Sequence, residues 1–535
     1  MSLIEPLESR IAPAAGLTLT QGPGGSLAVD ATGGDDRIEL RSDEPGWLTA
    51  IVYFDAGGEA PTIAVDGVIK SNPYTMPMPK GAITVNMLGG EDVLYLGPAT
   101  IPGSVIVNDL TSSAGTGGGV VISGLTVKGA LTINGSSGDD IITVDGKLSV
   151  GKDFNVNFGG GTFDGMANSY SGLTVKIGGS FRVQGTADAT AVTLGLDISG
   201  NPVRANADPG DDPLTMRELR VGKDFTFTSP NGRLFLGSAL TQIGGKLDAR
   251  ATGASGSIDF FSRAGNTQGI IGGLNVQAAD RTNVYVDALA LKIGKGISVT
   301  GGTGNDSFTL FGRDTMSLPK TNLIFGDGNS TVFVQAHEAW TLSGSLALTA
   351  GNGDDSFTIA GPGKITGGVT GDFGVGHSFV AMTGEQSGRL SFGPLVKFAA
   401  QSQMVVRIYN ANLAGKVEVT GSDGADALFF DSVKVAGSVA FTSGLGSDLF
   451  SVDGRLSAET SAPVYLPLFV TPSVFSGPIN VDLGGDTDYM EIGTNTFTGR
   501  ASFLSLVSIR GVAGENTFVA GQQSVTFKKQ PTILQ

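Results

Sequence analysis

The feature that most constrains this chain is an internal repeat of 22 residues. A fixed period of this length is typical of solenoid proteins, in which each repeat is one structural unit. Two of the copies follow one another without a gap, so the period belongs to the chain and does not depend on how segments are chosen. The five best copies are residues 125–146, 291–312, 340–361, 411–432 and 433–454.

Each copy carries the same pattern of apolar and polar residues. In 411–432 the first alternating pair is Val417 and Val419. A Gly-x-Asp turn follows, and then a second alternating pair, Leu428 and Phe430. Alternation with a period of two predicts a strand with one buried face. One copy therefore predicts short strands joined by tight turns.

Such a unit does not bury its apolar face alone, because a hairpin-sized piece of sheet is only marginally stable in water. Stacking of successive units buries these faces and continues the backbone hydrogen bonds from coil to coil. The sequence therefore predicts an all-β fold, a right-handed parallel β-helix or β-solenoid with coils of roughly 22 residues. In this fold Val417 should lie beside Val439, and Asp426 beside Asp448.

The repeat also predicts how the chain is divided. Residues 1–15 form an N-terminal arm with a sorting-like motif. Residues 16–124 repeat less regularly and predict an irregular β region that caps the stack, because an open sheet edge invites aggregation. Residues 125–535 predict the solenoid. Three segments break its period and predict loop insertions, where solenoids often carry recognition sites: 159–172, 197–216 and 457–477.

Composition excludes several kinds of chemistry. The chain has no Cys, which rules out thiol catalysis, zinc–thiolate sites and iron–sulfur clusters. Its two histidines, His337 and His377, lie in no metal or catalytic motif. With 34 Lys and Arg against 50 Asp and Glu, the net charge is −16, which disfavours binding of nucleic acid. No apolar run reaches the length of about 18 residues that a membrane-spanning helix needs.

One turn resembles a known calcium-binding repeat. Residues 301–309 read Gly-Gly-Thr-Gly-Asn-Asp-Ser-Phe-Thr. They match the nonapeptide Gly-Gly-x-Gly-x-Asp-x-U-x of RTX proteins, where U is large and apolar, and four other turns match it with one or two losses. The resemblance implies calcium held by backbone carbonyls and by the Asp at the sixth position. That position is occupied here by Asp140, Asp306, Asp355, Asp426 and Asp448.

The chain departs from the RTX pattern in one respect. RTX nonapeptides follow one another directly, whereas this chain has one such turn in each 22-residue copy. Two interpretations of the Asp positions therefore stay open. Either the Asp side chain bonds nearby backbone amides and makes a tight turn, or stacked Asp turns hold calcium. No cofactor is required under the first interpretation.

The N-terminus resembles the LEPR-XLL family, a short motif at the start of large repetitive bacterial proteins. Leu7, Glu8 and Arg10 match its core, Ser9 replaces its Pro, and Ile-Ala follows where two Leu are usual. The resemblance covers about 15 residues and implies export or surface sorting. The alternative is an N-terminal arm with no sorting role.

Three classes of function follow. The first is a secreted or cell-surface structural or adhesive solenoid with no catalytic site, whose partners are surface or matrix polysaccharides or other surface proteins. The second is an exported RTX-like calcium-binding module. The third is a β-helix polysaccharide lyase or hydrolase, which needs carboxylates and a basic residue on one face. Candidates for that third function lie in a Pro-rich stretch: Arg204, Asp208, Asp211, Asp212 and Arg217.

Overall fold

The computed structural model describes residues 16–534 with internal gaps, and the chain divides into two units, Met1–Gly245 and Lys246–Gln535. The described residues form β-strands, turns and loops, with one short 3-10 helix at Pro23–Gly25. Residues outside the description are 1–15, 33–34, 54–60, 89–91, 111–118, 136–138, 159, 166–173, 186–189, 195–215, 237, 255, 386, 454–470, 494–500, 512–515, 522–524 and 535.

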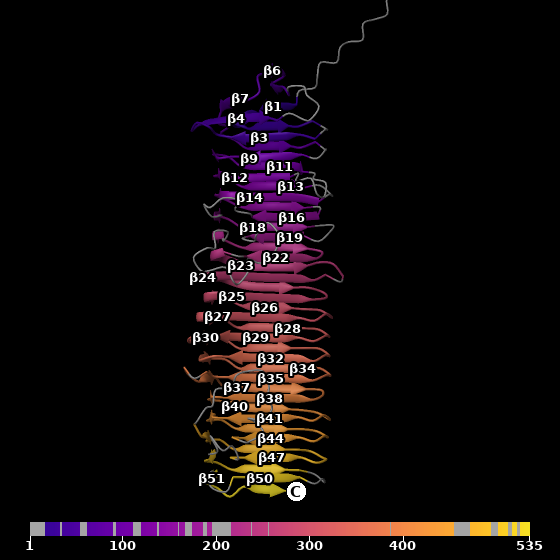
Figure 1. Ribbon diagram of the computed structural model, residues 1–535, viewed down its shortest axis with the longest axis vertical. Helices are drawn as coiled ribbons and strands as arrows, with labels where there is room; N and C mark the ends of the chain where they lie inside the picture. The colour runs from indigo at the N-terminus through magenta and orange to yellow at the C-terminus, as the bar shows by residue number, and fades with distance from the viewer. Residues whose placement is uncertain are drawn as a thin grey trace, which may run out of the picture. The chain divides into compact units, whose positions relative to one another are not determined.

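The second unit is built from three parallel ladders, A, B and C, and each coil adds a strand to each ladder (Figure 1). Ladder A contains β27 (Ser307–Leu318), β30 (Trp340–Leu342), β33 (Gly363–Ile365), β36 (Leu390–Phe392), β39 (Ala411–Leu413), β42 (Lys434–Val435), β45 (Ser473–Phe475), β48 (Ala501–Phe503) and β51 (Val525–Phe527). Ladder B contains β26 (Ile297–Thr300), β28 (Thr321–Ile324), β31 (Leu346–Thr349), β34 (Val369–Phe373), β37 (Leu395–Ala400), β40 (Lys416–Thr420), β43 (Val439–Thr442), β46 (Ile479–Asp482), β49 (Val507–Arg510) and β52 (Thr532–Leu534).

Ladder C completes the coil. It contains β25 (Thr282–Ile293), the first part of β27, β29 (Thr331–Ala336), β32 (Asp355–Ala360), β35 (Ser378–Thr383), β38 (Met404–Tyr409), β41 (Ala427–Asp431), β44 (Leu449–Val452), β47 (Tyr489–Ile492) and β50 (Thr517–Ala520). At the start of the unit β24 (Ile258–Gln277) and β25 bend at corners, so that one strand serves more than one ladder.

The first unit repeats this arrangement. Its ladder A contains β10 (Ala99–Ile101), β12 (Gly119–Val127), β14 (Asp139–Val150), β17 (Thr174–Ile177), β20 (Met216–Val221) and the first part of β23 (Ser238–Ala251). Its ladder B contains β2 (Leu27–Asp30), β8 (Ile83–Asn86), β11 (Val105–Leu110), β13 (Leu131–Gly135), β15 (Phe154–Phe158), β18 (Phe181–Gly185) and β21 (Phe225–Ser229). Its ladder C contains β3 (Arg37–Arg41), β9 (Val93–Leu96), parts of β12 and β14, β16 (Gly160–Gly165), β19 (Thr190–Leu194) and β22 (Gly232–Leu236).

Antiparallel strands occur at the start of the first unit. The antiparallel pairs join β1 (Leu17–Gln21) to β2, β3 to β4 (Trp47–Val52), β4 to β7 (Tyr74–Pro77), and β5 (Ile63–Val65) to β6 (Val68–Lys70). Within the same expected capping region of 16–124, β8 and β11 already pair in parallel. Hairpins and the first parallel coils are therefore interleaved in that region.

The structure confirms the predicted parallel β-solenoid and its register. Val417 pairs with Val439 across β40 and β43, and both side chains are fully buried. The ladders also keep their register across two of the expected insertions, since Phe181 pairs with Phe225 and Val439 with Ile479. The greater part of those two insertions lies outside the described residues. Of the remaining expected insertion, 159–172, residues 159 and 166–172 also lie outside them, whereas Gly160–Gly165 forms strand β16 of ladder C and not the expected loop.

Stacked side chains fill the interior of each unit. In the first unit the ring centroid of Phe181 lies 5.0 Å from that of Phe154 and 4.6 Å from that of Phe225. In the second unit Phe475 and Phe503 stack with centroids 5.2 Å apart. Like residues lie over like because parallel pairing in register places equivalent inward positions one strand spacing apart, about 4.8 Å.

The glycine before ladder B in the repeat is explained by backbone crowding. A Cβ atom at Gly437 would overlap the carbonyl oxygen of Gly415, the equivalent residue of the preceding coil. A Cβ atom at Gly415 would likewise overlap the carbonyl oxygen of Pro394. Successive coils approach each other so closely at this corner that a side chain has no room.

Candidate functional site

The predicted Asp positions of the second unit lie at the turn between ladders B and C. Asp306, Asp355, Asp426 and Asp448 each stand just before or at the start of a ladder C strand, and each is only 1–2% exposed. Asp140 lies in β14 of the first unit, where its backbone pairs with Gly161, and its side chain is not among those that the structure describes. The side chains of these four Asp residues therefore point into the protein.

Each of these carboxylates accepts a hydrogen bond from the preceding coil. Oδ1 of Asp448 accepts the backbone N–H of Asp426 at 2.8 Å, and Oδ1 of Asp426 accepts that of Met404 at 2.8 Å. Oδ1 of Asp355 accepts the N–H of Ser330 at 2.9 Å. The side chain thus satisfies a buried amide that would otherwise be unpaired at the end of the ladder, which is costly in free energy.

Asp306 accepts two hydrogen bonds from a single residue of the preceding coil, Thr282. Its Oδ1 accepts the backbone N–H of Thr282 at 2.7 Å and the Thr282 hydroxyl at 2.8 Å. A Cβ atom at Gly301 would overlap the Asp306 carboxylate, and one at Gly421 would overlap that of Asp426. The glycine that opens these two motifs therefore makes room for the Asp side chain five residues later.

Related residues that had not been predicted as site residues extend the pattern. Oδ1 of Asp488 accepts the N–H of Asp448 at 3.1 Å, and Oδ1 of Asn516 accepts the N–H of Asp488 at 3.0 Å. In the first unit, Oδ1 of Asp92 accepts the N–H of Asp36 at 2.9 Å. The signal in the sequence was a Gly-Gly pair shortly before Asp92 and Asp488. Asn516 shows that the contact needs the oxygen acceptor and not the charge.

Burial makes these carboxyl groups weaker acids than an exposed Asp. Desolvation raises the pKa of Asp306, Asp355 and Asp448 to about 6. It raises the pKa of Asp426 to about 7, and repulsion from Asp448 contributes to that shift. The pKa of Asp92 in the first unit rises to about 7 for the same main reason, burial.

The second carboxyl oxygen, Oδ2, of several of these Asp residues accepts no hydrogen bond. Within the described part of the chain, Oδ2 is buried without a hydrogen-bond partner in Asp92, Asp306, Asp355, Asp448 and Asp488. An unpartnered buried oxygen favours the neutral carboxylic acid, because a charge there is poorly solvated. The geometry and the raised pKa values therefore agree.

The described side chains do not form a calcium coordination set. Calcium takes six to eight oxygen ligands, whereas each turn supplies one buried carboxylate whose Oδ1 faces an amide N–H. Among the residues that the structure describes, no three His, Asp or Glu side chains form a group that could hold a metal ion. Asp426 does bond within its own turn, since its Oδ2 accepts the N–H of Ser422 at 3.0 Å. The contact shared by all four carboxylates, however, reaches an amide of the preceding coil and not the nearby amide that the tight-turn interpretation expected.

The exposed side of the same turns carries a second row of hydrogen bonds. In this row the side-chain oxygen accepts an N–H of the following coil, not of the preceding one. Oδ1 of Asn305 accepts the N–H of Asn329, Oδ1 of Asn329 accepts that of Asp354, and Oδ1 of Asp354 accepts that of His377, each at 2.9 Å. The buried Asp therefore bonds to the coil before it, and the exposed residue bonds to the coil after it. Both rows join neighbouring coils.

A buried carboxylate at the corner between ladders C and A was missed by sequence reasoning. Asp453 is fully buried, and its Oδ1 accepts the N–H of Ser432 at 3.0 Å and the hydroxyl of Ser473 at 2.7 Å. Its Oδ2 accepts the N–H of Ser473 at 2.9 Å. Burial, together with the neighbouring Asp431, raises the pKa of Asp453 to about 7. Asp453 thus joins the preceding coil, at Ser432, to the start of β45, at Ser473.

The predicted candidates for polysaccharide cleavage are not placed by the structure. Arg204, Asp208, Asp211 and Asp212 lie outside the described residues. Arg217 lies in β20, and its side chain is not described. The described residues also include no helix that is long and apolar enough to cross a membrane.

These features define the class of protein: a three-sided parallel β-solenoid in which the repeated polar residues join one coil to the next. Comparison of the chain with protein-family models, with curated proteins and with solved structures gave no match.

Proposed function

We propose that this protein is a secreted or cell-surface structural or adhesive β-solenoid that carries out no catalysis. The observation that supports this most is the use of the repeated Asp residues. Asp426 and Asp448, which an enzyme or a metal site would turn toward a ligand, instead accept backbone amides of neighbouring coils. The most repeated polar group of the chain is therefore used to build the scaffold.

The N-terminal motif and the charge support the location. Leu7, Glu8 and Arg10 resemble an export or sorting motif, and a net charge of −16 favours solubility and repels nucleic acid. The partners of such a scaffold are surface or matrix polysaccharides or other surface proteins. An extended array of side chains at a regular spacing suits contact with a long, repetitive partner.

Surface display is tested by labelling intact producing cells with an antibody to the solenoid. Signal on intact cells, lost when residues 2–15 are deleted, is the expected result. A Glu8→Gln/Arg10→Gln variant tests the motif itself, and a Ser2→Ala variant is the matched control. Signal only after the cells are opened would contradict the proposal.

A polysaccharide lyase or hydrolase is the competing function. It depends on Asp208, Asp211 and Asp212, which stand between β19 and β20 in the sequence. Incubation with acidic polysaccharides distinguishes the two functions, because a lyase releases unsaturated sugars that absorb in the ultraviolet and a hydrolase releases sugars with new reducing ends. Release of such products, abolished in an Asp208→Asn/Asp211→Asn/Asp212→Asn variant, would replace the proposed function.

A further inference from the structure

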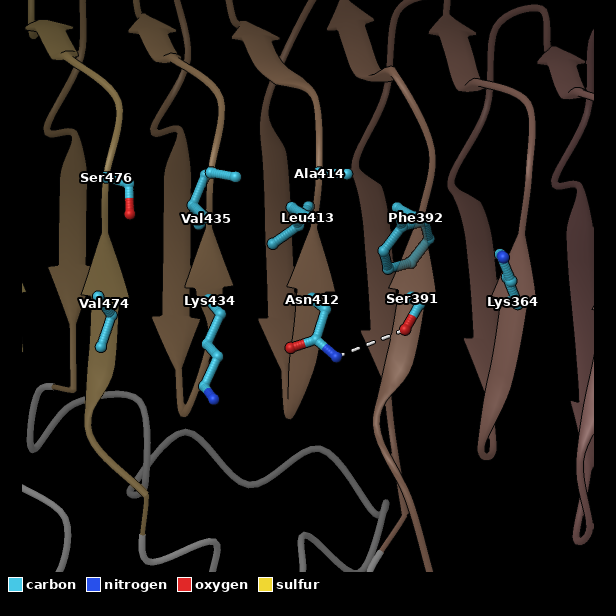
Figure 2. Close-up of a pocket in the computed structure, with 11 residues that line it drawn as sticks. Lys364, Ser391, Phe392, Asn412, Leu413, Ala414, Lys434, Val435, Val474 and Ser476 are labelled. Carbon is cyan, nitrogen blue, oxygen red and sulfur yellow. Dashed lines mark hydrogen bonds between the residues drawn. The ribbon is translucent and has the colours of Figure 1, made fainter.

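A groove runs over the outer face of ladder A in the second unit. It crosses β33, β36, β39, β42 and β45 and encloses about 590 Å³ (Figure 2). Phe392, Leu413 and Val435 also line it, and each is at most 3% exposed. The residues that follow two of these strands, Ala414 and Ala436, are small and exposed, so they leave the groove open to solvent.

One row of side chains lies along this groove at the middle position of the strands. Lys364 pairs with Ser391, Ser391 with Asn412, and Asn412 with Lys434. Each coil therefore contributes one residue to the row. Figure 2 shows these four side chains on successive strands. At about 4.8 Å per strand, the two lysines are separated by three steps, roughly 14 Å.

The row carries no acidic residue, although the protein is strongly acidic overall. Its members in the described ladder A strands of this unit are Lys292, Ser317, Thr341, Lys364, Ser391, Asn412, Lys434, Val474, Ser502 and Thr526. The equivalent row of ladder B, in contrast, contains Glu418 beside Lys397. Among the described residues, no carboxylate forms an ion pair with Lys364 or Lys434, whereas Lys416 of ladder B pairs with Glu418.

The first unit has a groove at the same position of its own coils. Lys176, Arg220 and Gln242 occupy the row there, in a groove of about 440 Å³. Its positive charge is partly neutralised, because Glu218 forms an ion pair with Lys176 at 2.7 Å and another with Arg220. The groove of the second unit therefore has the greater net positive charge along its row.

We infer that this groove of the second unit binds an anionic polysaccharide, a carboxylate-bearing glycan chain laid across successive coils. Lys364 and Lys434 contact its carboxylates, and Ser391 and Asn412 hydrogen-bond to its hydroxyl groups. The inference rests on the proposed adhesive function and names the partner. Nucleic acid fits less well, because its dense phosphates meet only scattered cations and the field of a protein with a net charge of −16.

The experiment measures binding of polygalacturonate and of alginate to the full chain by calorimetry at low salt. The neutral polysaccharide dextran and a single-stranded oligonucleotide are the comparison ligands. We expect the polyuronates to bind and dextran not to bind. In the Lys364→Gln/Lys434→Gln variant the affinity should fall about five- to tenfold, because two exposed charge contacts are lost. Added salt should weaken binding by the wild type more than by the variant.

A Lys397→Gln variant is the matched control, since Lys397 is an exposed lysine on ladder B of the same unit. Its affinity should equal that of the wild type, and all variants should share the wild-type melting temperature. The inference is overturned if no polyuronate binds, if the control loses as much affinity as the double variant, or if the oligonucleotide binds more tightly. Any of these three results, if the protein is still displayed on cells, contradicts the polysaccharide partner but leaves the proposed function intact. Absence from the cell surface removes the proposed function whatever the groove binds.

Discussion

The backbone N–H of Asp426 donates a hydrogen bond of 2.8 Å to Oδ1 of Asp448, a residue 22 positions later in the chain. Asp448 donates in the same way to Asp488, 40 positions later. The contact therefore follows the coil and not a fixed sequence separation. It makes the Asp turn an element of coil stacking, with consequences for stability and its pH dependence.

Replacement of Asp448 tests the role of the oxygen acceptor. Asp448→Ala leaves the buried amide of Asp426 without a partner and should lower the free energy of unfolding by about 1–3 kcal/mol. Asp448→Asn keeps the acceptor, as Asn516 does naturally, and should stay within about 1 kcal/mol of the wild type. Chemical denaturation followed by circular dichroism measures both. An equal loss in the two variants would show that the charge, not the acceptor, is needed.

The raised pKa values predict greater stability in mild acid. The pKa values of Asp426 and Asp448 are about 7 and about 6 in the folded protein, above the ordinary Asp value of 3.8. Between pH 3.8 and these values the folded state therefore binds more protons than the unfolded state. Stability from this source is fully present below pH 3.8 and is lost as pH rises through 6 to 7. Calorimetry should therefore give a higher melting temperature at pH 5 than at pH 7.5.

The general repulsion of an acidic protein acts in the same direction, so the pH effect needs a control. An Asp426→Asn/Asp448→Asn variant removes both titrating groups and keeps both acceptors. Its melting temperature should change less between pH 5 and pH 7.5 than that of the wild type. An unchanged slope would show that Asp426 and Asp448 do not contribute to the pH dependence.

Crowding at the corner before ladder B predicts that Gly437 is required. Gly437→Ala places a Cβ atom against the carbonyl oxygen of Gly415 and should cost about 1–3 kcal/mol of stability. Gly296 is a matched control, because no atom lies within 4 Å of the Cβ position there. Gly296→Ala should change stability by less than about 0.5 kcal/mol. Equal melting temperatures for the two variants would contradict the close approach of the coils.

Calcium should have little effect on stability. The Oδ1 atom of each described Asp in these turns already accepts an amide N–H, so the melting temperature in millimolar calcium chloride should equal that in a chelator. Magnesium chloride at the same ionic strength controls for screening. A rise specific to calcium, lost in Asp306→Asn/Asp426→Asn, would instead establish the RTX-like interpretation of these turns.

The parallel fold and part of its register could be predicted from the sequence. Where two copies abut, as at 411–454, the period alone places Val417 beside Val439, because equal coil lengths leave one alignment of the apolar faces. The position of the buried Asp was predictable for the same reason. The start of the chain was harder: β8 and β11 belong to parallel coils, but hairpins such as β3–β4 lengthen the first coils and hide the period.

The sequence by itself determined the alternation, the tight turns and the glycines, which are local properties of a strand and its corners. It also determined that copies stack, because one copy cannot bury its own apolar face. Only the tertiary structure decided that Asp426 bonds to the coil before it, that Asp453 joins Ser432 to Ser473, and that Lys364 and Lys434 share one row. These contacts depend on which residues of different coils meet, and coils of unequal length place those residues together only when the ladders are formed.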